Sequence, residues 1–306
     1  MRKIKGQVYN TFADKIHSAP LPSSNTSYIV SFTTAGAHTL NIPNGYSIMQ
    51  IVAVGGGGSG GGKPATGGAG GGSGGGTGFK SVYLKPSGNG ALSIVVGGGG
   101  STALATVNGT SGTATTITGP ALGGITLTAP GGNPGLSASR TGGTGVSATG
   151  WDAQGTSGAG GTGGSGAQDS GGCGGGAAGT TGTGGVGQAG ASASSQGGAG
   201  SGNAGGGGST PFAAELATGT GGGGIGQPGG YTNNGNNALQ MPGGYPGTDG
   251  GFLPPAKPGT AIAGSTRSGS AGGAGGGGGA GAGGSGAAGT GGAGGVGVVS
   301  IMFTKA

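Results

Sequence analysis

The segment Gly57–Lys63 is the first place in the chain where residue types and spacing could support chemistry. Its glycines and lysine match the G-x-x-x-x-G-K part of a phosphate-binding loop, in which backbone N–H groups and the lysine surround the phosphates of a nucleotide. Pro64 then stands where the motif needs a serine or threonine to bind magnesium, and the residues that follow, ATGGAGGGSGGGTG, include few helix formers. Because the phosphate would bind at the N-terminus of a following helix, the sequence predicts no nucleotide site, and Lys63 is expected to be an exposed loop charge.

Other catalytic signals are weaker still. Residues 71–75 match the G-x-S-x-G pattern of a nucleophilic serine, but such a match is expected from composition in a chain with 97 glycines. The two histidines, His17 and His38, lie far in sequence from the five dispersed acids, and Cys173 has no histidine near it. The sequence therefore predicts no enzymatic activity, no metal site and no cofactor.

Composition excludes several classes of protein. The chain has 306 residues, of which 97 are glycine and 15 are proline, yet it lacks the strict G-X-Y repeat of collagen. Charged residues make up only 5%, too few to solvate a disordered chain. The formal charge of +6 comes from scattered residues without an aromatic-interleaved basic stripe, so we expect no nucleic-acid partner. No secretory signal peptide and no apolar run of membrane-spanning length is present, so we expect no membrane insertion.

The elements that must position any site are β-strands near the two ends of the chain. Alternating or fully apolar segments predict strands within residues 27–32, 38–42, 46–54, 79–85, 91–96, 113–118, 124–129 and 295–305. The segment 46–54 is apolar on both faces, as a central buried strand would be. The C-terminal strand needs the early strands as partners, so the glycine-rich region between them is expected to be an insertion whose ends are held together.

The non-glycine residues of this insertion recur at steps of three, as in Ala177, Thr180, Thr183, Val186 and Ala189. A period of three matches neither an α-helix nor a strand, but it does match the left-handed extended helix of the polyproline II type. Such helices make no internal hydrogen bonds, so their N–H and C=O groups must pair with neighbouring helices. We therefore expect a bundle of glycine helices held together by backbone; the alternative is a disordered glycine linker.

Three segments carry a family resemblance. SFTTAGAHTLNIPNGYSIMQIVAVGGGGSGGG resembles the opening of the glycine-rich domain of bacteriophage tail-fibre and minor tail proteins, in which an F-x-x-A/P-G-x-x-x-x-x-[IV]-P strand pair precedes an apolar strand and a V-x-G-G-G-G turn. FKSVYLKPSGNGALSIVVGGGG resembles the next hairpin of that family, and GGAGGVGVVSIMFTK its closing strand. The resemblance covers about residues 27–130 and 290–304.

This resemblance implies an all-β fold, in which a small antiparallel β-sandwich encloses a long glycine-rich insertion packed as polyglycine II helices. Four parts are expected: an N-terminal docking arm at 1–26, the sandwich at 27–130, the glycine region with its loops at 131–295, and the closing strand at 296–306. Similar tracts occur in the tail-fibre tip adhesins of T-even-like phages, where distal loops contact the host receptor.

By resemblance, the chain would be a virion protein that binds a host receptor at the end of a tail or tail fibre. It would be made in the host cytoplasm, and its partners would be other tail or fibre proteins and a glycan or protein of the host surface. Phage fibres are often homotrimers, whereas tip adhesins can be monomers, and both states stay open. A non-adhesive capsid spike or decoration protein is the main alternative, ahead of a cell-surface protein of silk type.

Residues that break the glycine period are the candidates for recognition, because loops on a rigid scaffold often carry binding sites. The receptor-binding candidates combine aromatic rings, which stack on sugars or anchor protein contacts, with amides and acids: Trp151, Asp152, Phe212, Tyr231, Asn233, Asn234, Asn236, Tyr245 and Phe252. The alternative is that these aromatics only cap the glycine bundle. The candidates for attachment to the virion are Arg2, Lys3, Ile4, Lys5, Val8, Tyr9 and Phe12, unless residues 1–26 are a solvated tail.

Overall fold

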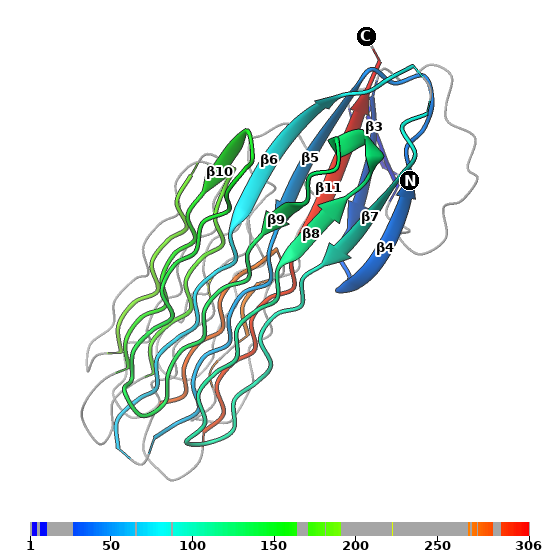
Figure 1. Cartoon of the computed structure of the whole chain (residues 1–306). Coiled ribbons are helices and arrows are strands. Elements are labelled where there is room, and N and C mark those ends of the chain that lie inside the picture. The colour runs from blue at the N-terminus through cyan, green and yellow to red at the C-terminus, as the bar shows by residue number, and fades with distance from the viewer. Residues whose placement is uncertain are drawn as a thin grey trace.

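The protein consists of two β-sheets and a set of long extended glycine-rich segments that continue from their strands (Figure 1). The computed structural model describes residues 2–4, 7–10, 27–64, 66–86, 88–163, 171–180, 182–190, 222, 269, 271–273, 275–283 and 289–305, the first two of these ranges as backbone only. Within these residues a single turn of 3-10 helix, Pro120–Leu122, is the helical element. None of the described helices is long and apolar enough to cross a membrane.

The first sheet has the strand order β1-β2-β3-β11-β5-β6-β10. Its strands are β1 (Arg2–Ile4), β2 (Gln7–Asn10), β3 (Ser27–Phe32), β5 (Ile48–Val54), β6 (Thr77–Tyr83), β10 (Ala153–Gly155) and β11 (Val298–Thr304). The second sheet has the order β4-β7-β8-β9, with β4 (Gly36–Asn41), β7 (Ala91–Val96), β8 (Thr115–Thr118) and β9 (Leu127–Ala129). Neighbouring strands are antiparallel except β2 and β3, which are parallel.

The closing strand β11 lies in the middle of the first sheet, between β3 and β5. It pairs along its whole length with β5, from Val298 opposite Val54 to Thr304 opposite Ile48. The prediction that the C-terminal strand pairs with the early strands is therefore confirmed, and so is the interior position of β5. Strand β10 was not predicted from the sequence, because three residues carry too little pattern.

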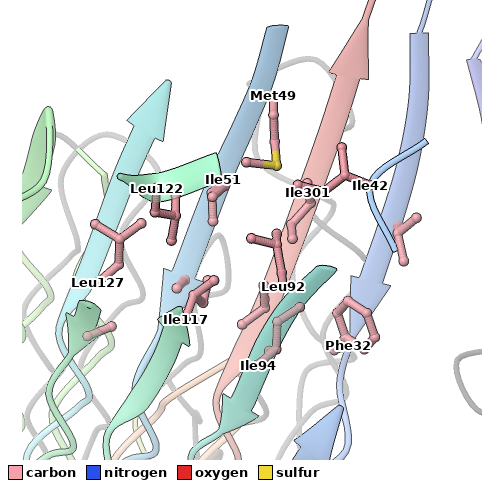
Figure 2. Packing of buried hydrophobic residues seen from close by; sticks show 14 of the residues in the cluster. Phe32, Ile42, Met49, Ile51, Leu92, Ile94, Ile117, Leu122, Leu127 and Ile301 are labelled. Carbon is pink, nitrogen blue, oxygen red and sulfur yellow. The ribbon is translucent and has the colours of Figure 1, made fainter. Parts of the chain in front are cut away.

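The hydrophobic core lies between the two sheets, as in a β-sandwich. Figure 2 shows Ile51 of β5 and Ile301 of β11 on one side and Leu92, Ile94 and Ile117 of the second sheet on the other; all five are fully buried. Alternate residues of β3, β7 and β11 belong to this core, so one face of each strand points inward.

The glycine-rich segments exchange backbone hydrogen bonds with a period of three residues. Within 55–63, successive N–H groups donate in rotation to three antiparallel neighbours, 70–76, 107–113 and 289–295, over 2.8 to 3.1 Å. The bonds to the first neighbour run from Gly55, Gly58 and Gly61 to the carbonyls of Gly76, Ser73 and Gly70. Backbone groups that would be costly to bury unpaired are thus satisfied by segments distant in sequence.

Close approach of these segments explains the glycines. A Cβ added at Gly57 would lie 2.0 Å from the carbonyl oxygen of Gly277, and one at Gly60 would lie 2.0 Å from that of Ala280. Both distances are far shorter than a carbon–oxygen contact allows. Glycine is therefore required where two backbones touch, and the region is held by backbone rather than by side chains.

Residues other than glycine occupy positions where a segment faces solvent. In 182–190, the residues Thr183, Val186 and Ala189 are exposed, whereas four of the five glycines of the segment are buried. The same step of three exposes Thr156 and Thr162 in the adjoining segment. Thr183, Val186 and Ala189 belong to the spacing of three that is visible in the sequence, whereas Ala177 of the same series is fully buried. Glycine segments also come from 55–76 and 97–113, inside the range where the sequence suggests only the sandwich.

Candidate functional site

The molecule has two different ends. The sheets lie at one end, and the glycine segments run from them to turns at the other (Figure 1). Two of the described turns at the far end contain residues 101–108 and 136–141. We call these two turns together the distal turn surface.

The first turn presents two apolar side chains on a fixed backbone. Leu104 is 69% exposed and Val107 is 50% exposed, and the N–H of Val107 donates to the carbonyl of Leu104 over 3.1 Å. The turn is tied to the neighbouring segment, because Thr106 donates to the carbonyl of Lys63 and the N–H of Gly62 donates to that of Val107, each over 2.9 Å. Thr106 has a φ of 65°, a left-handed conformation that is uncommon for a residue other than glycine.

The second turn is attached to the first through an amide side chain. Asn108 accepts a hydrogen bond from the N–H of Ser137 over 2.8 Å. Arg140, which also has a left-handed backbone with a φ of 60°, closes the turn by donating from its N–H to the carbonyl of Ser137. The carbonyl of Arg140 in turn accepts the N–H of Gly163. The two turns thus form one hydrogen-bonded surface.

Lys63 corrects an expectation from the sequence. It is 2% exposed rather than an exposed loop charge, and its Nζ donates to the carbonyl of Pro64 over 3.4 Å. After a bend at residues 66–67, the amides of residues 69–76 join the glycine network, and no helix follows Lys63. Lys63 therefore lies inside the far end of the glycine region, where a phosphate could not reach it from solvent.

The chemistry available at the distal turn surface is contact rather than catalysis. Ser73, which matches the nucleophile pattern, is fully buried, and its Oγ accepts the N–H of Asn133 over 2.8 Å. No group of three or more histidine, cysteine, aspartate or glutamate side chains suited to a metal occurs among the residues that the structure describes. What the surface offers is the exposed pair Leu104 and Val107 among threonine, serine and asparagine.

Trp151 does not lie on this surface. Only 8% of it is exposed, its ring belongs to the core between the sheets, and its Nε1 donates to the carbonyl of Thr128 over 2.9 Å. A Cβ at Gly78 would lie 2.1 Å from the ring, so the ring rests directly on the backbone of β6. Its expected role as an exposed receptor contact is therefore corrected: the ring fills a gap that the glycine leaves in the sheet.

Asp152, next to Trp151, anchors the same turn to β6. Its carboxylate accepts the Nζ of Lys80 over 2.5 Å and the N–H of Ser81 over 2.8 Å. The hydrogen bond from Lys80, followed by that from Ser81, lowers the pKa of Asp152. A carboxylate paired in this way fixes the turn to the sheet end and lies away from the distal turns.

The remaining candidates cannot be placed in the site. Phe212, Tyr231, Asn233, Asn234, Asn236, Tyr245 and Phe252 lie outside the described residues, as do Lys5 and Phe12 among the attachment candidates. Arg2, Lys3 and Ile4 form β1, and Val8 and Tyr9 belong to β2, whose backbone pairs with β3 at the edge of the first sheet. The N-terminal arm is thus extended where it is described, and its part in attachment stays a prediction.

Sequence reasoning missed Leu104, Thr106, Val107 and Arg140, which the fold brings to the far end. A signal was present in STALATVNGT, residues 101–110, where apolar residues interrupt two glycine-rich stretches without a strand-like alternation. The left-handed conformations of Thr106 and Arg140 had no signal, because neither is glycine or asparagine.

No protein-family model matches the chain, and no curated protein matches it significantly. A functional proposal therefore depends on the geometry of this chain.

Proposed function

We propose that the chain is a virion protein that acts as a receptor-binding adhesin at the end of a phage tail or tail fibre. The observation that carries the proposal is the distal turn surface, where Leu104 and Val107 are exposed on turns whose backbones are fixed by hydrogen bonds. Exposed apolar side chains on a preorganised surface lose little conformational entropy when they bind. They contact the host surface receptor, a glycan or a surface protein.

We further propose that the glycine-rich region is packed as polyglycine II helices. The rotation of hydrogen bonds among three neighbours supports this, since a helix with three residues per turn directs every third N–H to the same side. At about 3.1 Å per residue, the segment 55–63 would carry its turn on the order of 28 Å from the sheets. The region would be a stiff spacer that holds the distal turns away from the rest of the particle.

In this proposal the sheet end attaches to other tail or fibre proteins. Strands β1, β2 and the end of β11 all belong to the sheets, opposite the distal turns (Figure 1). The basic residues Arg2 and Lys3 of β1 then belong to the attachment end. The protein would be made in the host cytoplasm and act in the assembled virion.

One observation favours the alternative, a structural virion protein such as a spike or decoration without receptor affinity. Trp151 is built into the core, as a residue that only caps the fold would be. The two proposals differ in the distal turns, which contact a receptor in the first and only solvent in the second.

The test is binding of the purified full chain to a panel of candidate host bacteria, with a Leu104→Ser, Val107→Ser double variant beside it. We expect saturable binding by the wild type and at least a tenfold loss of affinity in the variant, because the pair supplies the apolar contact. The matched control is Val95→Ser with Val186→Ser, which changes two exposed valines, 41% and 54% exposed, away from the distal turns.

Equal loss of binding in the control would show that the effect is not local to the distal turns. A well-folded wild type that binds none of the panel, or a distal variant that binds as well as the wild type, favours the structural virion protein.

A further inference from the structure

The two flanks of the sandwich are closed to different extents. On one flank, the turn with Trp151 links the sheets, since Thr149 forms a bridge with Thr128 of β9 while β10 pairs with β6. The opposite flank of the second sheet ends at β4, which pairs with β7 on one side. None of the six residues of β4 is buried, and Gly36, Ala37, Thr39 and Asn41 are exposed.

The free side of β4 presents backbone groups at alternate residues. The N–H of Ile42, directly after β4, donates to the carbonyl of Gly90, which continues the β4–β7 register. In an antiparallel ladder, residues two apart direct their N–H and C=O groups to the same side. The backbone N–H and C=O groups of His38 and Leu40, like those of Ile42, therefore point toward β7. The backbone groups of Ala37, Thr39 and Asn41 point outward.

We propose that this edge pairs with β4 of a second copy of the chain, antiparallel and about a two-fold axis at Thr39. The outward groups of Thr39 then bond to those of Thr39 of the second copy, and the groups of Ala37 bond to those of Asn41 of the second copy. The pattern is symmetric about its centre, as a two-fold interface between identical surfaces requires. The two second sheets become one continuous sheet.

The side chains of β4 support a second copy as the occupant. The strand has no lysine, arginine, aspartate or glutamate. Two copies of the chain, each of formal charge +6, can therefore meet at this edge without like charges facing each other. In this register Thr39 lies opposite Thr39 of the second copy, a favourable cross-strand pair, and His38 lies opposite Leu40 of the second copy. The edge also lacks the lysine, proline or bulge by which exposed strands usually avoid such pairing.

The test is the mass of the full chain in solution, measured by light scattering and sedimentation over a range of concentrations. We expect a species of twice the 27.0 kDa monomer mass. Thr39→Pro removes an outward N–H without touching the bonds to β7, and the dimer dissociation constant should rise about tenfold or more. Thr39→Val keeps the backbone groups and the β-branched shape, and should weaken the dimer far less than Thr39→Pro does.

A second variant distinguishes a loss of dimer formation from a loss of folding. Thr39→Lys places two ammonium groups side by side at the axis, so it should weaken the dimer while the circular dichroism spectrum stays that of the wild type. Thr39→Cys should form a disulfide-linked dimer on mild oxidation, because opposite residues of an antiparallel pair lie within disulfide range; Cys173, fully buried, does not compete. A monomeric wild type, a trimeric mass, or a dimer that neither Thr39→Pro nor Thr39→Lys weakens would overturn the proposal.

Discussion

The sandwich and the glycine region are held together by different interactions. In the sandwich, side chains such as Ile51, Ile94 and Ile301 fill the space between two sheets. In the glycine region, segments such as 55–63 approach so closely that a Cβ would collide with a neighbouring carbonyl. The first region is held together mainly by burial of apolar side chains, and the second by backbone hydrogen bonds.

This difference decides which changes each region tolerates. A core of side chains can repack around a smaller residue and loses free energy in proportion to the cavity. Backbone in contact with backbone has no side chain that can move aside, so an added methyl group is the damaging change. Substitutions in each region therefore have different expected effects on stability.

The largest effect is expected from removing the strand that joins the two regions. A chain ending at Gly297 lacks β11, so β3 and β5 lose their shared neighbour and the core loses Ile301 and Phe303. We expect no cooperative unfolding transition in calorimetry. A truncated chain that unfolds cooperatively near the wild-type temperature would contradict the central place of β11.

The next effect tests the aromatic residue in the sandwich. Trp151→Ala removes a buried ring that rests on β6 and should lower the free energy of unfolding by about 3–5 kcal/mol. Denaturant unfolding measures this loss. Binding to host cells at a temperature where the variant is folded should be unchanged, because Trp151 is not on the distal turn surface. Loss of binding by the folded variant would indicate that Trp151 contributes to the receptor site.

A smaller effect separates the two kinds of core at single glycines. Gly57→Ala places a Cβ 2.0 Å from the carbonyl oxygen of Gly277, and should lower the free energy of unfolding by about 1–3 kcal/mol. Gly98→Ala is the matched control, because its Cβ would find its nearest atoms at 3.8 Å; it should change stability by no more than about 0.5 kcal/mol. Equal thermal shifts in the two variants would show that the tight contacts do not hold the region.

The smallest effect is a dependence on pH. The pKa of Asp152 is lowered in the folded protein by its hydrogen bonds from Lys80 and Ser81, so its contribution to stability is present above its unfolded pKa, about 4. It is lost as the pH falls through the lower folded value. Asp152→Asn should therefore unfold at a slightly lower temperature than the wild type at pH 7, and the gap should close in strong acid. A gap that widens in acid would contradict the pairing.

The strands of the fold could be predicted because their patterns are local. Alternating or apolar segments indicated β3, β5, β7 and β11, and the need of β11 for partners indicated that the glycine-rich region is an insertion with its ends held together. β10 could not be predicted, since it is fixed by Trp151 lying on Gly78, a contact between residues distant in sequence. The buried position of Trp151 could not be predicted for the same reason, because the sequence does not show that its ring packs on Gly78.

The distal turn surface was not predictable for a related reason. The turns at 101–108 and 136–141 meet because the segments leading to them are packed in a register set by backbone hydrogen bonds. Glycine tracts carry no side-chain pattern from which that register could be read. The period of three was visible where residues other than glycine recur, as at Thr183 and Val186, and it does not show which segments are neighbours.

The most direct test of this account is amide hydrogen exchange across 55–63, compared with β5. If backbone bonds to three neighbours hold the glycine region, the amides of 55–63 should exchange as slowly as those of Ile48–Val54, although they belong to no sheet. Exchange at the rate of an unstructured glycine peptide, with β5 still protected, would contradict the account and make the region a linker.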